Sequence, residues 1–187
     1  IKDVSWTGDT QGFEYINKNE KFKELFINIK KVVIKYLDHL KIDENVIDLY
    51  ITRSWATMSD GKEQISPHNH LQSHISFAYY LKKSATDSNI VFIDNHFQNE
   101  IVPGIFRNPT IKDNGVIKGF SLFNAPSVDL NIQEDDIVIF PSKTFHRTQA
   151  DKMNDGRISI SGDIVCLLKD SNLLENIMPP LENWEKL

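Results

Sequence analysis

The sequence predicts a mainly β fold with flanking helices (α+β), in which an N-terminal amphipathic helix supports an antiparallel sandwich or barrel. Three observations predict it. Between residues 19 and 40, apolar residues recur at three- and four-residue spacing, which is the period of a helix with one buried face. Beyond residue 42, short runs rich in β-branched and aromatic residues follow one another. Stretches rich in Gly, Asn, Asp, Pro and Ser separate these runs, without a helical pattern between them.

The length of the chain indicates one domain. A chain of 187 residues can bury one substantial core, so we expect a single domain over residues 1–187. Within it we expect helical support over 1–42, a strand-rich core over 43–169 and a C-terminal tail over 170–187.

Composition argues against several classes of function. The net charge of −5 argues against a general nucleic-acid or membrane-surface binder, which would carry a basic excess. No apolar run approaches the roughly 18 residues of a membrane span, so we expect no membrane partner. Cys166 is the single cysteine and cannot form an internal disulfide, which fits a reducing, cytoplasmic setting.

The predicted helix begins after Asn19 and ends near Leu40. Asn19 is a suitable N-cap, and Glu20 and Glu24 suit the positive end of the helix dipole. The apolar face consists of Phe22, Leu25, Phe26, Ile29, Val33, Leu37 and Leu40. This face should pack against the strands that follow.

The strand-rich part is interrupted by a long insertion. Residues 95–118 contain Pro103-Gly104, Asn108-Pro109 and Asn114-Gly115 and have little periodicity. Insertions of this length often act as lids or binding loops. Strands are predicted at 46–56, 74–82, 89–94, 119–125, 136–140 and 157–167.

Histidine is the residue type that points to a site. Three of the six histidines lie within residues 68–74. In an extended segment His68 and His70 project from the same face, so they can hold one metal ion between them. His146, after the strand at 136–140 and a Pro-Ser turn, is the candidate third ligand. His74 is expected to be a hydrogen-bonded or pocket-lining residue, and from spacing alone metal binding and structural histidines remain open alternatives.

Four segments in this order resemble a known family. They are Pro67-His68-Asn69-His70, Ser76-Phe77-Ala78-Tyr79-Tyr80-Leu81, Phe140-Pro141-Ser142 ahead of His146, and Arg157-Ile158-Ser159. Together they resemble the iron(II)- and 2-oxoglutarate-dependent dioxygenases, in particular the prolyl-hydroxylase-like 2OG-Fe(II) oxygenases with a His-x-His motif. The resemblance covers roughly residues 50 to 167. It implies a double-stranded β-helix, a jelly roll whose open end holds the metal.

The resemblance also implies roles for the histidines. His68 would be the first iron ligand and His146 the distal one. His70 stands where the prolyl-hydroxylase branch has a carboxylate, and a third imidazole would leave the ion more positive. Either the site uses three histidines, or His70 lies behind the ligands and a carboxylate such as Asp94 completes the set.

A cosubstrate site is implied by residues further along the chain. Arg157 would pair with the distal carboxylate of 2-oxoglutarate, because a planar guanidinium suits bidentate carboxylate recognition. Ser159 shares its face and would assist. Tyr79 occupies the place of a tyrosine that reaches the same carboxylate in related hydroxylases, although strand alternation leaves Tyr80 as an alternative.

The implied activity uses Fe(II) with 2-oxoglutarate and O₂ as cosubstrates, and hydroxylates an unactivated C–H bond with release of succinate and CO₂. Arg53 and Trp55 are candidates for lining the pocket of a small-molecule or peptidyl substrate. A cupin-type metal-dependent dioxygenase or isomerase that does not use 2-oxoglutarate is one alternative. A noncatalytic jelly-roll binding module is another. The sequence indicates neither the substrate nor the oligomeric state.

Overall fold

The computed structural model describes residues 2–3, 14–59, 63–85, 88–93, 99–106, 113–121, 123–149, 156–170 and 175–187. The helical elements are η1 (Ile16–Lys18), η2 (Glu20–Phe22), α1 (Lys23–His39) and η3 (Leu181–Asn183). The strands are β1 (Lys2–Asp3), β2 (Ile47–Ser59), β3 (Glu63–His68), β4 (Ile75–Lys82), β5 (Ile90–Ile93), β6 (Ser127–Asp129), β7 (Ile137–Pro141), β8 (Phe145–Thr148) and β9 (Arg157–Leu168).

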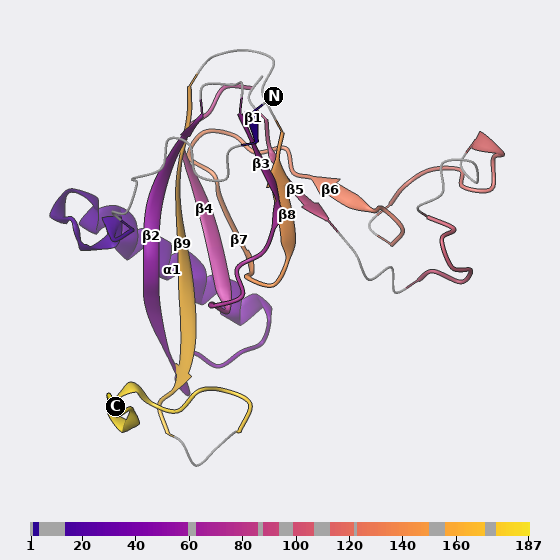
Figure 1. Cartoon of the computed structure of the whole chain (residues 1–187). Helices are drawn as coiled ribbons and strands as arrows, with labels where there is room; N and C mark the ends of the chain where they lie inside the picture. Colours follow the sequence, from indigo (N-terminus) through magenta and orange to yellow (C-terminus); the bar gives the residue numbers. More distant parts are fainter. Residues whose placement is uncertain are drawn as a thin grey trace.

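Two sheets form the body of the protein (Figure 1). One sheet has the strand order β2-β9-β4-β7 and the other the order β1-β3-β8-β5-β6. Neighbouring strands pair antiparallel except β1 and β3, which pair parallel. This arrangement is the expected jelly-roll fold, mainly β with one N-terminal α-helix. Among the described residues, no helix is long and apolar enough to cross a lipid bilayer.

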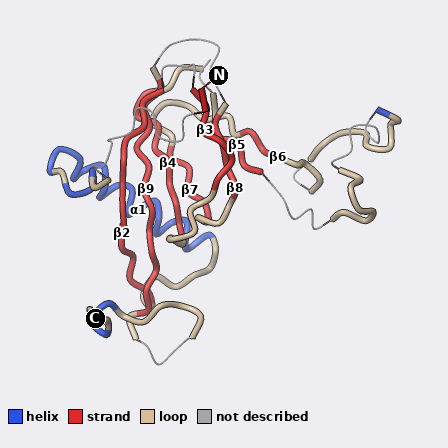
Figure 2. The backbone as a smooth tube through the Cα atoms, viewed as in Figure 1, coloured by secondary structure: helices blue, strands red, loops and turns tan. Residues whose placement is uncertain are grey.

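Helix α1 covers the outer face of the four-stranded sheet (Figure 2). Its buried side chains are Phe26, Ile29, Val33 and Leu37. They pack against the sheet residues Ile47, Ile75, Phe77, Ile160, Ile164 and Leu168. The prediction of an amphipathic helix is therefore confirmed. The side chain of Asn19 accepts a hydrogen bond from the Lys21 N–H at 3.0 Å, so Asn19 caps the 3₁₀ turn η2 that precedes α1.

Close packing of this core depends on a glycine in β9. Gly162 pairs with Phe77 of β4, and the Phe77 ring lies across it. A Cβ atom added at Gly162 would stand 2.6 Å from Cζ of Phe77 and 3.1 Å from the Arg53 carbonyl oxygen. Any larger residue would therefore force the Phe77 ring out of its place.

A β-bulge in β2 divides the strand into two parts with different roles. The register with β9 shifts between Ile51 and Arg53. Before the bulge Leu49 and Ile51 pack toward the helix-covered core, whereas after it Arg53 and Trp55 line the space between the sheets. An extra residue reverses the alternation of side chains. The bulge therefore aims Arg53 and Trp55 at the candidate site.

Some element predictions were wrong. The described residues of the range 119–125, where a strand was predicted, do not form one, because Ala125 N–H donates to Ser121 O in a turn, and the edge strand β6 begins at Ser127. Strands β3 and β8, which carry two of the candidate histidines, were not predicted as strands. The described parts of the long insertion, 99–106 and 113–118, extend away from the sheets (Figure 1), and none of their residues lines the cavity between the sheets.

Candidate metal centre

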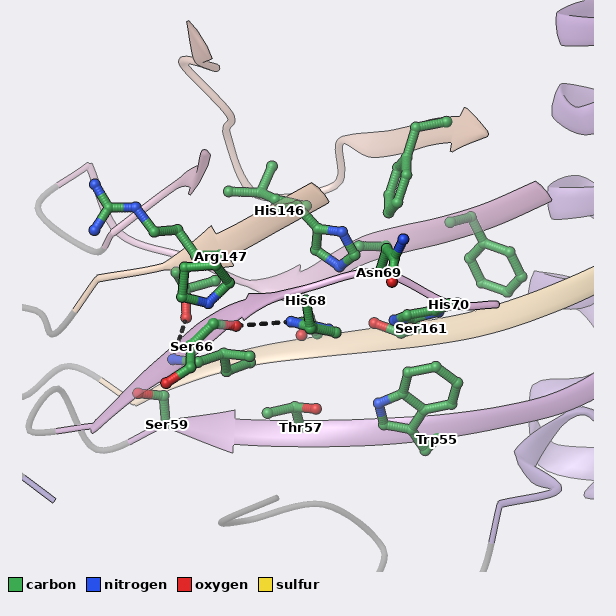
Figure 3. A pocket seen from close by; sticks show the side chains of 18 of the residues that line it. Trp55, Thr57, Ser59, Ser66, His68, Asn69, His70, His146, Arg147 and Ser161 are labelled. Atoms are coloured by element: carbon green, nitrogen blue, oxygen red, sulfur yellow. Dashed lines mark hydrogen bonds between the residues drawn. The ribbon is translucent and has the colours of Figure 1, made fainter. Parts of the chain in front are cut away.

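Three histidines converge in the cavity between the two sheets (Figure 3). His68 ends β3 and pairs in register with His146 of β8, so these two rings are neighbours across the strands. His70 follows in the turn after β3, where its N–H donates to Ser142 O at 2.9 Å. One ring nitrogen from each of the three histidines lies within 4.8 Å of the others. The structure thus brings together the three predicted ligands.

The hydrogen bonds of the three imidazole rings determine which ring nitrogen can bind a metal ion. His68 Nδ1 lies 2.9 Å from Ser66 O, and His146 Nδ1 lies 2.9 Å from Thr144 O. A carbonyl oxygen can only accept, so both Nδ1 atoms carry the proton. His70 Nδ1 lies 2.6 Å from Oδ1 of Asp163, which also accepts. In each ring Nε2 therefore keeps its lone pair for a metal ion.

Burial keeps two of these imidazoles neutral. Burial, together with the nearby His68 and His70, lowers the pKa of His146 to about 4, against the opposing effect of its hydrogen bond to Thr144. Burial also lowers the pKa of His68, although the hydrogen bond to Ser66 opposes the shift. Neutral imidazole is the form that binds metal ions, so both rings are ready to act as ligands at neutral pH.

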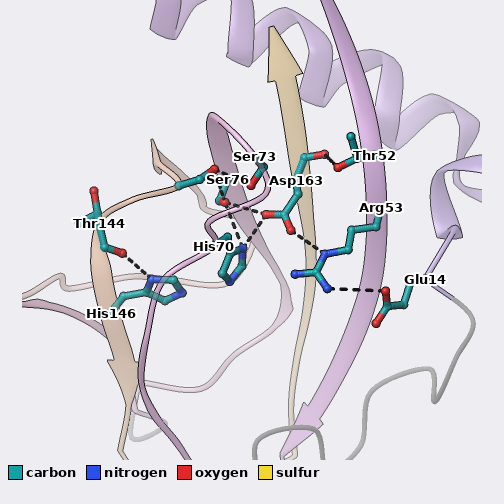
Figure 4. Close-up of polar contacts among 10 residues, drawn as sticks. Glu14, Thr52, Arg53, His70, Ser73, Ser76, Thr144, His146 and Asp163 are labelled. Atoms are coloured by element: carbon teal, nitrogen blue, oxygen red, sulfur yellow. Dashed lines mark hydrogen bonds and ion pairs between the residues drawn. The ribbon is translucent and has the colours of Figure 1, made fainter. Parts of the chain in front are cut away.

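A buried carboxylate lies behind His70 (Figure 4). Asp163 of β9 is fully buried, and its Oδ1 accepts from His70 and from Ser76 Oγ at 2.7 Å. Its Oδ2 accepts from Arg53 Nε, also at 2.7 Å. Burial by itself would raise the pKa of Asp163, but the hydrogen bonds from His70, Arg53 and Ser76 bring it below the usual value. Asp163 was missed by sequence reasoning, although it shares strand parity with Arg157 and Ser159.

The same cavity contains the predicted cosubstrate residues. It has a volume of about 450 Å³, and Arg157, Ser159 and Tyr80 line it with the three histidines. Arg157 is only 4% exposed, and its Nη1 donates to Ser88 O at 2.8 Å and to Ser88 Oγ at 2.6 Å. These bonds use both hydrogens of Nη1. Within the described part of the chain, Nε and Nη2 have no partner, so three N–H groups remain available to a ligand.

The prediction for Tyr79 needs a correction. Its hydroxyl donates to Asp135 Oδ1 at 2.7 Å, and Tyr79 does not line the cavity. Tyr80, the alternative left open by strand alternation, is 3% exposed and does line it. Burial raises the pKa of Tyr80 to about 12, so its hydroxyl stays protonated at neutral pH. The segment after His70 turns at residues 71–72 and then enters β4, where Ala78 and Tyr80 line the cavity.

The remaining predicted residues concern the substrate pocket, the third histidine of the 68–74 segment and the alternative ligand. Arg53 and Trp55 line the cavity as expected, with Cζ of Arg53 4.7 Å from the centre of the indole ring. His74 is exposed, and its Nδ1 accepts from the N–H of Cys166 at 3.0 Å. Asp94, the proposed alternative ligand, lies outside the described residues.

A protein-family model matches the strand-rich part of the chain. The model of the family described as "Putative 2OG-Fe(II) oxygenase" matches residues 53–163. This range includes the three histidines and Arg157, and ends at Asp163. A comparison with curated proteins finds no match.

Solved structures that resemble this chain are distant from it in sequence. An oxidoreductase of the 2OG-Fe(II) oxygenase family from Burkholderia pseudomallei is 10% identical, with a TM-score of 0.45 over 63% of this chain and 44% of that one. A prolyl-4-hydroxylase from Pseudomonas putida is 11% identical, with a TM-score of 0.47 over 78% and 65%. HygX from Streptomyces hygroscopicus, solved with iron bound, is 11% identical, with a TM-score of 0.39 over 62% and 57%. The chain spans less than two thirds of the length of each.

Proposed function

Because the chain belongs to the 2OG-Fe(II) oxygenase family, we propose that it hydroxylates an unactivated C–H bond, using iron(II), 2-oxoglutarate and O₂ and releasing succinate and CO₂. One observation carries this proposal. A single cavity contains three histidines whose Nε2 atoms are available and a buried arginine with three unpartnered N–H groups among the described residues. A metal ion and an anion both have suitable partners there.

The residues present fit iron(II). His68, His70 and His146 would hold the ion through their Nε2 atoms, because their Nδ1 atoms already donate to protein oxygens. Three protein ligands leave coordination positions for a cosubstrate and O₂. Bound iron(II) supplies, with 2-oxoglutarate and O₂, the oxidising power for the C–H bond. The protein supplies the positions and the enclosed cavity.

The residues on β9 and β4 fit the cosubstrate. We assign Arg157 to the distal carboxylate of 2-oxoglutarate, because its Nε and Nη2 can form two parallel charge-assisted hydrogen bonds. Ser88 holds the guanidinium through Nη1 and so fixes the direction of the other two nitrogens. Ser159 and the protonated hydroxyl of Tyr80 are the additional donors.

The part of the cavity beside β2 is the proposed substrate position. Arg53 and Trp55 provide a cation and an aromatic surface there, which suits a small-molecule or peptidyl substrate with polar groups. The free thiol of Cys166 and the need to keep iron ferrous both favour the reducing cytoplasm.

A second candidate is a metal-dependent dioxygenase or isomerase that does not use 2-oxoglutarate. The observation that favours it is the ligand set itself, since three imidazoles without a carboxylate also suit such enzymes. It leaves the three available N–H groups of Arg157 without a role. The family assignment therefore favours the first proposal.

Metal loading followed by a turnover assay tests the proposal. Protein loaded with Fe(II) without oxygen should bind about one iron per chain and, when 2-oxoglutarate and air are added, form succinate above a protein-free control. His146→Ala should lose both iron and succinate formation, because one of three ligands is removed. Bound iron without any 2-oxoglutarate consumption, with or without candidate substrates, would support the second candidate. No metal binding would refute both.

A further inference from the structure

The ligand set poses an electrostatic question. The family resemblance places a carboxylate where this chain has His70, so the three ligands are all neutral imidazoles. A carboxylate ligand would bring one negative charge to the metal centre, whereas neutral imidazole ligands bring none. We propose that Asp163 supplies this charge through His70, as a positioning residue that fixes the His70 tautomer and strengthens metal binding. The inference rests on the metal centre of the proposed function.

The two carboxylate oxygens of Asp163 accept hydrogen bonds from different residues. Oδ1 accepts from His70 Nδ1 at 2.6 Å, and Oδ2 accepts from Arg53 Nε at 2.7 Å. Ser76 Oγ donates to Oδ1 at 2.7 Å. Each described side chain that hydrogen-bonds to this fully buried carboxylate is thus a donor. An ionised carboxylate, which only accepts, is the group that satisfies all three.

A line of hydroxyls supports the same oxygen. Ser73 Oγ donates to Ser142 Oγ at 2.9 Å, and Ser142 Oγ lies 2.8 Å from Ser76 Oγ. Since Ser76 donates to Asp163, the hydroxyls can be oriented in one direction, each polarising the next toward the carboxylate. Ser142 belongs to the turn between β7 and β8 that precedes His146. The network therefore connects the backbone around two of the three ligands.

The three histidines are not equivalent in this respect. His68 and His146 donate to the neutral backbone carbonyls of Ser66 and Thr144. His70 donates to a carboxylate, which makes its Nε2 more basic than that of a carbonyl-bonded ring. The charged partner stands behind the one imidazole that occupies the carboxylate position. The negative charge therefore lies on Asp163, which hydrogen-bonds to the ligand His70, and not on a ligand itself.

Asp163 has a competing explanation as a mere counter-ion for Arg53. A carboxylate built only for that purpose would be expected to take the guanidinium through both oxygens. Here Arg53 donates to Oδ2 through Nε, whereas Oδ1 accepts from His70 and Ser76, and the Arg53 Nη1 points toward a second acid, Glu14, with Oε2 at 3.7 Å. The shortest bond of Asp163 is the one to His70. The geometry therefore favours the role toward the histidine.

The variant Asp163→Asn separates charge from shape. An amide has one acceptor oxygen and an NH₂ group, while three donors approach this position. Some donor must then face the NH₂ group, and if that donor is His70 its proton moves to Nε2, where it blocks metal binding. The matched control is Asp135→Asn, which makes the same chemical change on the carboxylate that accepts from Tyr79, outside the cavity.

The first measurement is Fe(II) affinity, determined without oxygen by competition with a chromophoric chelator. We expect Asp163→Asn to weaken binding by about 10–100-fold, as losses of partners behind metal ligands do. Asp135→Asn should stay within about twofold of wild type, since surface changes away from a site have small effects. The double variant Arg53→Met/Asp163→Asn also removes the cation that donates to the Asp163 carboxylate. We expect its Fe(II) affinity to be lower than that of wild type by about the same 10–100-fold. If Asp163→Asn does not fold, the double variant tests the inference in its place.

The second measurement is the tautomer of His70 in the metal-free protein, read from ¹⁵N NMR of the histidine side chains. Wild type should show protonated Nδ1, and Asp163→Asn should show a shift toward the Nε2–H form, which a purely structural role would not produce. Unchanged iron affinity and an unchanged tautomer in Asp163→Asn, with binding lost in His146→Ala, would overturn this inference alone. Retained binding in His146→Ala would instead refute the proposed metal centre.

Discussion

Replacing Arg157 with methionine should remove most of the affinity for 2-oxoglutarate. Arg157 has three N–H groups without a partner among the described residues, on Nε and Nη2, in a side chain only 4% exposed. A hydrogen bond to a charged group contributes about 1.5–3 kcal/mol. Loss of a bidentate pair should therefore cost about 3 kcal/mol, which corresponds to about a 100-fold higher Kd. Calorimetric titration of 2-oxoglutarate into the Fe(II)-loaded protein, without oxygen, measures it.

Two further variants separate the contribution of the paired guanidinium donors of Arg157 from that of its positive charge. Arg157→Lys keeps a cation but loses the planar pair of donors, so its Kd should lie between those of wild type and Arg157→Met. Ser88→Ala removes the hydroxyl that accepts from Nη1 and should raise Kd by less than about tenfold, the value of one hydrogen bond. An Arg157→Met protein that still binds iron and keeps its affinity for 2-oxoglutarate within twofold would refute the assignment of Arg157.

Two other predictions follow from the positions of single residues. Tyr80→Phe should raise the Kd for 2-oxoglutarate by about 2–10-fold through loss of one hydrogen bond, whereas Tyr79→Phe should leave it unchanged, and the reverse order in the same titration would restore the original prediction for Tyr79. Gly162→Ala should lower the free energy of unfolding by about 1–3 kcal/mol, because the new Cβ would stand 2.6 Å from the Phe77 ring. The control Gly119→Ala has no atom within 4 Å of the added Cβ. Urea unfolding that gives equal stability for both variants would contradict the packing argument.

The parts of the fold predicted well are those with a strong sequence period. The helix was expected from Asn19 to Leu40, and α1 with its leading turn runs from Glu20 to His39. The long strand β9 was also located within a residue of its ends. Strand β8 was missed because it is only 4 residues long and begins directly after a turn. The strand predicted at 119–125 was wrong because apolar residues in a loop give the same local signal as a short strand.

The site divides in a similar way. His68, His70, His146 and Arg157 were identified from motifs and line one cavity in the structure. The choice between Tyr79 and Tyr80 could not be made from sequence, because it depends on the number of residues in the turn after His70. An alternation rule fixes a face only as long as the strand continues.

Asp163 illustrates what strand parity can show when burial is known. Strand β9 is buried on both faces, and such strands usually read as continuous apolar runs. Here the even positions 158, 160 and 164 are isoleucine, while the odd positions carry Arg157, Ser159, Ser161 and Asp163. A buried polar face costs free energy unless each group has a partner. Four such positions in succession on one strand therefore indicate a face that binds polar ligands. The pattern was present in the sequence, but it became informative only when α1 was seen to cover the opposite face.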